Sequence, residues 1–155
     1  MVNNQQNNSK TAFLFPGQGS QFVGMGIELY QQSCAARSVF DRVDSALDKP
    51  ISKLMFEGPE EELVKTINAQ PAIMTVSLAC HAAMLEILDD KLMPKPAMMA
   101  GHSLGEYTAL VVAGVVDLDT GVKLVRERSR LMQEACEQEE VGAESILLAT
   151  FLYRR

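Results

Sequence analysis

The sequence predicts an α/β domain built around a parallel sheet, on three observations. Two short apolar runs, residues 11–15 and 97–100, each end at a glycine-containing bend, which is typical of buried strands. The segments between and after these runs carry apolar residues at steps of three and four, which indicates helices. Strands separated by helices favour a parallel sheet. Two strands form only a small part of such a sheet.

Length, charge and cysteine usage limit the classes of protein to which the chain can belong. Its 155 residues have the size of one domain. A net charge of −6 argues against broad binding to nucleic acid or a membrane surface, so an anionic ligand needs a local site. No apolar run reaches the ~18 residues of a membrane span. Three widely spaced cysteines without a Cys-x-x-Cys pair indicate a reducing compartment, and we expect a cytoplasmic protein without a zinc site.

The N-terminal half predicts one strand followed by helices. Residues 1–10 lack the basic start and apolar core of a signal peptide, and we expect a disordered polar tail before the strand. Helical spacing runs through residues 27–47, and a further helix starts after Gly58-Pro59. Pro71 opens a long helix whose apolar residues predict a core position.

The C-terminal half predicts the second strand and two further helices. Two prolines bracket a turn before residues 97–100. Residues 106–116 predict an almost wholly apolar helix, and Asp117 or Asp119 caps the next helix, over about residues 120–137.

The bend after the second strand carries the strongest chemical signal. Gly101-His-Ser-Leu-Gly105 fits G-x-S-x-G, a strand–turn–helix elbow that exposes a serine hydroxyl near backbone N–H groups. Glycine at both ends lets backbones pass closely, and the N–H of Leu104 is placed to donate to a developing oxyanion. Ser103 is therefore a candidate nucleophile, and the alternative is a structural turn serine.

The bend after the first strand, Gly17-Gln-Gly-Ser-Gln21, does not fit a dinucleotide fingerprint. G-x-G-x-x-G needs a glycine where the chain has Phe22, and no Walker lysine follows. The bend is better suited to supplying a second oxyanion donor through the backbone N–H of Gln18.

Arg128 interrupts the apolar face of the predicted last helix. The residues of that face are Gly121, Leu124, Val125, Arg128, Leu131, Met132 and Ala135. A buried guanidinium needs an anion, because its desolvation costs several kcal/mol. The anion is either an internal carboxylate or the carboxylate of a substrate, and a third interpretation is an arginine whose charged end reaches solvent.

A general base is harder to place, because the chain has two histidines and neither follows Ser103. His102 is adjacent to the serine, and neighbouring side chains at a bend diverge, which favours positioning or packing over proton transfer. His81 lies in the long core helix, where a structural role is expected.

Four motifs in order resemble those of the malonyl-CoA:acyl-carrier-protein transacylases of fatty-acid synthesis and the acyltransferase domains of polyketide synthases. They are Phe15-Pro-Gly-Gln-Gly-Ser-Gln21, Gln70-Pro-Ala72, Gly101-His-Ser-Leu-Gly-Glu106, and Arg128 followed by Leu131-Met-Gln-Glu134. The resemblance runs from about Thr11 to Ala135. It implies that Ser103 takes malonyl from CoA as an ester and passes it to the phosphopantetheine thiol of acyl carrier protein.

The resemblance also assigns the other site residues. Gln18 and Leu104 would form the oxyanion hole, Arg128 would hold the malonyl carboxylate, and His102 and Gln70 would line the pocket. Malonyl-CoA and acyl carrier protein are the implied partners, with malonyl-CoA as a substrate and neither cofactor nor metal required. The implied fold is the N-terminal part of an α/β-hydrolase-like large subdomain, over residues 11–137.

The chain also departs from the family pattern. Family members use a second histidine far downstream of the serine as base, and they carry a ferredoxin-like small subdomain and later strands that this chain lacks. Residues 138–155 are expected to be a divergent tail, which points to a truncated or frameshifted product. A catalytically impaired remnant that binds carrier protein, CoA or a partner is therefore the rival hypothesis, and a general serine esterase is a third. The incomplete sheet predicts self-association through its exposed edge.

Overall fold

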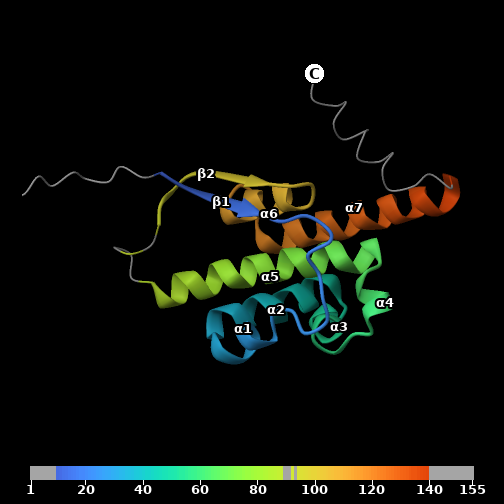
Figure 1. The fold of residues 1–155 in the computed structure, drawn as a ribbon, viewed down its shortest axis with the longest axis horizontal. Helices are drawn as coiled ribbons and strands as arrows, with labels where there is room; N and C mark the ends of the chain where they lie inside the picture. The colour runs from blue at the N-terminus through green and yellow to red at the C-terminus, as the bar shows by residue number, and fades with distance from the viewer. Residues whose placement is uncertain (1–9, 89–91, 93, 140–155) are drawn as a thin grey trace, which may run out of the picture.

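The computed structural model describes residues 10–88, 92 and 94–139, and these form a two-stranded parallel sheet and a set of helices (Figure 1). Strand β1 spans Thr11–Phe15 and pairs in parallel with β2, Pro96–Gly101. Both predicted strands are thus confirmed. The predicted polar tail and divergent C-terminal tail, apart from Lys10 and residues 138–139, lie outside the described residues.

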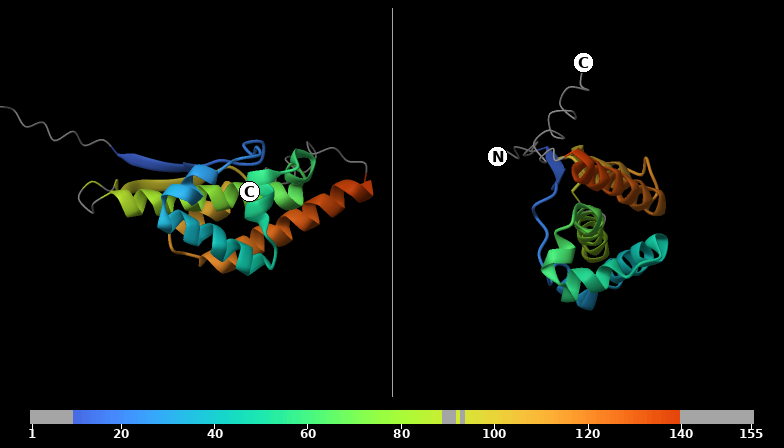
Figure 2. Two further views of the ribbon diagram at one scale, coloured as in Figure 1. Left: turned by 90° about the horizontal axis from the view of Figure 1, so that it is seen from below. Right: turned by 90° about the vertical axis from the view of Figure 1, so that its right-hand side faces the viewer.

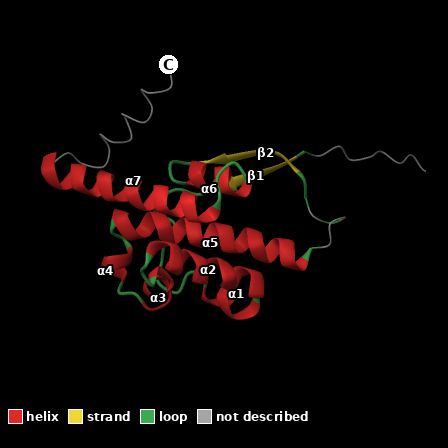
Figure 3. Cartoon of the chain, turned by 180° about the vertical axis from the view of Figure 1, so that it is seen from behind, coloured by secondary structure: helices red, strands yellow, loops and turns green. Residues whose placement is uncertain are grey.

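Helices make up most of the described chain, as the view from behind shows (Figure 3). Their bounds are α1 Ile27–Gln32, α2 Cys34–Leu47, α3 Ile51–Glu57, α4 Glu60–Leu63, α5 Thr66–Ile87, α6 Gly105–Val112 and α7 Leu118–Glu139. The helical spacing expected over residues 27–47 corresponds to two helices, α1 and α2, because the chain is extended at Ser33. The Ser33 hydroxyl accepts the N–H of Ala36 at 2.9 Å and so caps α2, which starts a new helix there.

Helix α5 begins at Thr66, earlier than the predicted start at Pro71. A proline inside a helix leaves the carbonyl four residues earlier without its N–H partner. Here that carbonyl belongs to Ile67, and Nη1 of Arg126 donates to it. The guanidinium from α7 therefore replaces the missing donor, and the helix continues through the proline.

Helix α5 lies at the centre of the helical core, where it packs against both α2 and α7 (Figures 1 and 2). Its residues from Asn68 to Thr75 are all buried. Large side chains from the surrounding helices complete the core, among them Phe40, Val43, Ile51, Met55, Leu63, Val122 and Val125, each 0% exposed. The rings of Tyr30, Phe40 and Phe56 add an aromatic cluster with centroids 5.3–5.7 Å apart.

The strands are less buried than expected. Along β1 the side chains of Phe13 and Phe15 are half-buried while Ala12 and Leu14 are exposed, so one face of the strand is covered. Phe13 meets His81 of α5, with ring centroids 6.1 Å apart. Leu14 is 75% exposed and Met98 of β2 is 59% exposed. The prediction of buried strands was wrong for this second face, because its larger apolar side chains remain mostly exposed to solvent.

None of the helices in the described part of the chain is both long enough and apolar enough to cross a membrane.

Candidate active site

The elbow between β2 and α6 has the geometry that its motif predicts. β2 ends at Gly101 and α6 begins at Gly105, which leaves Ser103 in the turn between them. Ser103 has φ 57°, in the left-handed region that side chains other than glycine seldom adopt. The N–H of His102 donates to the carbonyl of Phe15 at 3.1 Å and so ties the elbow to the end of β1.

Both glycines of the motif are required by close contact between backbones. A Cβ at Gly101 would lie 1.9 Å from the carbonyl carbon of Gly105. A Cβ at Gly105 would lie 2.3 Å from the carbonyl oxygen of Phe15. These distances are far inside van der Waals contact, so any larger residue would displace α6 from the strands.

Arg128 reaches across from α7 to the elbow. Its Nη2 donates to Ser103 Oγ at 2.8 Å, and its Nη1 donates to Gln70 Oε1. The guanidinium carbon lies 5.8 Å from the ring centroid of Tyr107, within the range of a cation–π contact. Among the described residues no carboxylate forms an ion pair with Arg128, so the expected alternative of an internal salt bridge is not what the structure shows.

The buried face of α7 is not the one that the spacing predicted. Val122, Val125 and Ser129 are fully buried, whereas Leu124 is 47% and Leu131 52% exposed. The predicted stripe through Arg128 was therefore wrong in part. Arg128 is half-buried at the edge of the packed face, beside the elbow.

Gln70 is buried at the centre of the site, with 1% of its surface exposed. Its Oε1 accepts a hydrogen bond from Arg128. Its Nε2 donates to Gln18 Oε1 at 3.3 Å and to Met132 Sδ at 3.5 Å. Gln18 in turn donates to the hydroxyl of Thr66 at 3.2 Å. The network therefore connects the loop after β1, the start of α5 and the middle of α7.

Two backbone N–H groups expected to be oxyanion donors are free to donate to a ligand. Within residues 10–88 and 94–139, neither the N–H of Gln18 nor that of Leu104 donates to a protein acceptor. The side chain of Leu104 is fully buried, which anchors its backbone at the start of α6.

The two histidines lie against other groups than the serine hydroxyl. The ring of His102 packs on Gly17, where a Cβ would lie 2.5 Å from its Nδ1. His81 faces Phe13 from α5, and burial lowers the pKa of His81 below its ordinary value.

Sequence reasoning missed Tyr107, Thr66 and Met132 as contacts of the site. Tyr107 follows Ser103 by four residues and Met132 follows Arg128 by four, so helical spacing was the available signal for both. Nothing local indicates Thr66, because its contact with Gln18 joins residues 48 positions apart.

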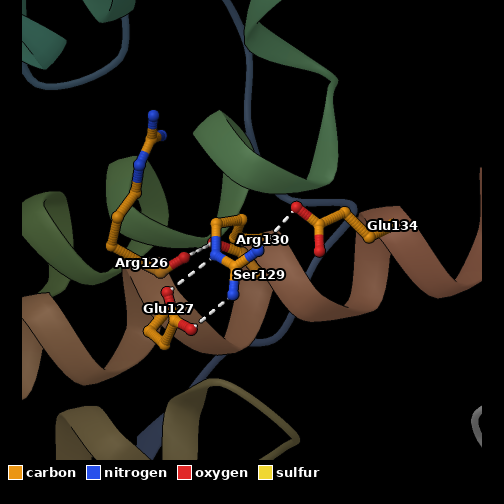
Figure 4. Close-up of polar contacts among 5 residues, drawn as sticks. All are labelled: Arg126, Glu127, Ser129, Arg130 and Glu134. Atoms are coloured by element: carbon orange, nitrogen blue, oxygen red, sulfur yellow. Dashed lines mark hydrogen bonds and ion pairs between the residues drawn. The ribbon is translucent and has the colours of Figure 1, made fainter.

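The neighbouring arginines of α7 have different partners from Arg128. Arg130 forms ion pairs with Glu127 at 2.6 Å and Glu134 at 2.5 Å (Figure 4), and these carboxylates raise its pKa. Arg126 donates to Ile67 and Asn68 of α5. Arg128 is thus the arginine of this stretch that reaches the serine.

The fold and the elbow define an α/β protein with a serine at a strand-to-helix turn, facing a guanidinium. The chain matches the acyl transferase domain family over residues 12–149, and it belongs to that family. The match extends past Ala135, where the motifs used to identify the family end.

Individual relatives agree with this family. The chain is 50% identical over 139 residues to the malonyl CoA-acyl carrier protein transacylase of Bacillus subtilis strain 168, covering 90% of this chain and 42% of the relative. The Escherichia coli K12 protein of the same name is 45% identical over 124 residues, covering 80% of this chain and 39% of the relative. The chain therefore spans about two fifths of the length of these curated relatives.

Solved structures show the same fold. An acyl-carrier-protein S-malonyltransferase from Bartonella henselae superposes with a TM-score of 0.76 at 48% identity, covering 81% of this chain and 40% of that one. A malonyl-transacylase solved in complex with a type II PKS acyl-carrier protein gives a TM-score of 0.73 at 42% identity, covering 82% and 40%.

Proposed function

We propose that this chain carries the acyl-accepting site of a malonyl-CoA:acyl-carrier-protein transacylase. In the proposed reaction Ser103 receives malonyl from CoA and passes it to the phosphopantetheine thiol of acyl carrier protein. The observation that carries the proposal is the 2.8 Å contact between Ser103 Oγ and an arginine that has no carboxylate partner among the described residues.

The position of Arg128 suits a malonyl ester. In such an ester the carboxylate carbon is three bonds from Oγ, so a guanidinium in contact with Oγ lies within reach of the acid. Guanidinium binds carboxylate through two parallel hydrogen bonds, which fixes orientation as well as charge. Tyr107 and Gln70 hold Arg128 through neutral contacts, which leave its charge available for a ligand.

The backbone around the serine supports acyl transfer. The free N–H of Leu104, next to Ser103 at the start of α6, is a suitable donor for a tetrahedral oxyanion, and the loop that carries Gln18 would supply the second. Such a site would work by ping-pong transfer through an acyl-serine.

The names of the relatives support the choice of partners. The Bacillus subtilis relative is named for malonyl CoA and acyl carrier protein, and the complex noted above contains an acyl-carrier protein. We extend both partners to this chain, with malonyl-CoA as substrate and no cofactor. A cytoplasmic location belongs to the same proposal, and the free thiols of Cys34, Cys80 and Cys136 support it.

The decisive experiment is covalent labelling of the chain by malonyl-CoA. We expect intact-mass analysis to show one added malonyl group, mapped to Ser103, and Ser103→Ala to stay unlabelled. Arg128→Met should label far more slowly, because the carboxylate loses its partner. Transfer of the label to holo acyl carrier protein then tests the second half-reaction. Labelling that is unchanged in Ser103→Ala would reject the proposal.

A binding fragment with impaired chemistry is the second candidate. It is favoured by the placement of both imidazoles, since His102 lies against Gly17 and His81 against Phe13, while the partner of Ser103 Oγ is Arg128. Removing a base that acts with its nucleophile leaves oxyanion and binding contributions. Retention of acyl carrier protein or CoA in a pull-down, without turnover, would favour this candidate.

A further inference from the structure

Arg128 bonds directly to the atom that would attack a substrate. Its Nη2 donates to Ser103 Oγ at 2.8 Å. A hydroxyl oxygen has two lone pairs, and this N–H holds one of them. Attack on an acyl carbon needs a lone pair of the same oxygen, so the contact lowers the nucleophilicity of the hydroxyl and fills space beside it.

Two uncharged side chains, those of Gln70 and Tyr107, hold the guanidinium in this contact. Gln70 accepts from the other end of the guanidinium, and Gln70 is itself buried and fixed by its bonds to Gln18 and Met132. The ring of Tyr107 lies beneath the guanidinium carbon. None of these partners neutralises the charge, so an entering carboxylate has no internal acid to displace.

We propose that, without substrate, the guanidinium of Arg128 blocks Ser103 Oγ, an arrangement that we call the cap. An acyl group bearing a carboxylate removes this cap. The inference rests on the function proposed above and adds a second source of substrate selection. A carboxylate binds guanidinium more strongly than a neutral hydroxyl does, so the malonyl acid draws Arg128 away from Oγ. An acetyl group carries no acid and leaves the cap in place.

The step that follows is an ordinary acyl exchange. Oγ forms a bond to the thioester carbon, the carbon–sulfur bond breaks, and CoA leaves as a thiol that carries the equivalent of the hydroxyl proton. No electron acceptor or further reactant is required. Selection against neutral acyl groups therefore acts on the reactivity of Ser103 as well as on affinity.

The test measures the reactivity of Ser103 toward a neutral electrophile in the full chain. Phenylmethylsulfonyl fluoride sulfonylates serine with loss of fluoride and a proton, and its rate is followed by intact mass. We expect Arg128→Met to react about tenfold faster than the wild type, the factor that corresponds to about 1.4 kcal/mol. Ser103→Ala should not react.

Arg130→Met is the matched control. It removes one positive charge from the same helix two residues away, but Arg130 is paired with Glu127 and Glu134 and does not contact the serine (Figure 4). Its sulfonylation rate should equal that of the wild type. The cap would be overturned if Arg128→Met reacted no faster than the wild type and Arg130→Met. Absence of reaction in Arg128→Met counts as this outcome.

A second experiment varies the anion in solution. Sodium formate offers the guanidinium a small carboxylate, and sodium chloride at equal ionic strength is the reference. Formate should accelerate sulfonylation of the wild type and leave Arg128→Met unchanged. Equal rates in formate and chloride for the wild type would overturn the cap.

Malonyl-CoA labelling separates the cap from the proposed function. A formate effect without malonyl labelling would reject the proposed function and retain the cap. Malonyl labelling without a formate effect would reject the cap and retain the function.

Discussion

The helical half of the molecule (α2, α5 and α7) and the strand half (β1 and β2) differ in how far their apolar side chains are buried. Phe40, Met74 and Val125 of the helical half are fully buried, while Leu14 and Met98 of the strand half are mostly exposed. The helical half closes a core from its own residues, whereas the strand half leaves one face uncovered. The proposed site lies where the halves meet, since Ser103 belongs to the elbow after β2 and Arg128 to α7.

The largest effect should come from the helical core. Phe40→Ala removes a ring that is fully buried against Tyr30 and Phe56, and it should lower the free energy of unfolding by about 3–5 kcal/mol. Urea unfolding measures the change. Phe22→Ala is the control, because Phe22 is 61% exposed and its loss should cost far less. Equal losses for the two variants would contradict a self-sufficient helical core.

The next effect should come from the junction of the two halves. In Gly105→Ala the new Cβ meets the Phe15 carbonyl, so we expect a loss of about 1–3 kcal/mol, as for other overpacked sites, together with loss of malonyl-CoA labelling. Gly114→Ala is the control, since a Cβ there meets nothing within 4 Å. Its left-handed backbone should cost about 1 kcal/mol, and labelling should persist. Normal labelling of Gly105→Ala would show that the elbow tolerates displacement from β1.

Local sequence was sufficient to predict the strands and the elbow. Apolar runs that end at Pro16 and Gly101 define β1 and β2, and the spacing of Gly101, Ser103 and Gly105 defines the turn. In each case the residues that determine the conformation are neighbours in the chain, so their conformational preferences act directly.

The features that failed prediction depend on distant contacts. Helix α5 extends before Pro71 because Arg126, 59 residues beyond Ile67, supplies the donor that proline removes. The true partners of Arg128 come from α5 and the elbow, and periodicity alone could not choose between a carboxylate and Gln70. The buried face of α7 was misplaced for the same reason, because packing against α5 decides which residues are covered.

A smaller effect should appear in the pH dependence of the contact between α5 and β1. Burial lowers the pKa of His81 in the folded state. At pH values between the folded and the unfolded pKa, the unfolded chain therefore binds more protons than the folded chain. The contribution of neutral His81 to stability is present above its ordinary pKa of 6.5 and is lost as the pH falls through its folded pKa. Thermal unfolding from pH 7.5 to 5.5 should show a falling midpoint that is shallower in His81→Gln.

A slope in His81→Gln equal to that of the wild type would contradict the assignment of the titrating contact to the face between α5 and β1.

The smallest effect on stability should come from the uncovered strand face, and there the informative quantity is association. Leu14→Thr with Met98→Thr removes two exposed apolar side chains and should change the free energy of unfolding by no more than about 0.5 kcal/mol. If the exposed apolar side chains of this face contribute to the self-association predicted from the incomplete sheet, sedimentation velocity should show concentration-dependent dimers or larger species in the wild type and fewer in the double variant. Val115→Thr, at a site 68% exposed on the turn after α6, should leave association unchanged. A wild-type chain that stays monomeric at all concentrations would contradict the predicted self-association. The helical half and the strand half would then differ only in how their side chains pack.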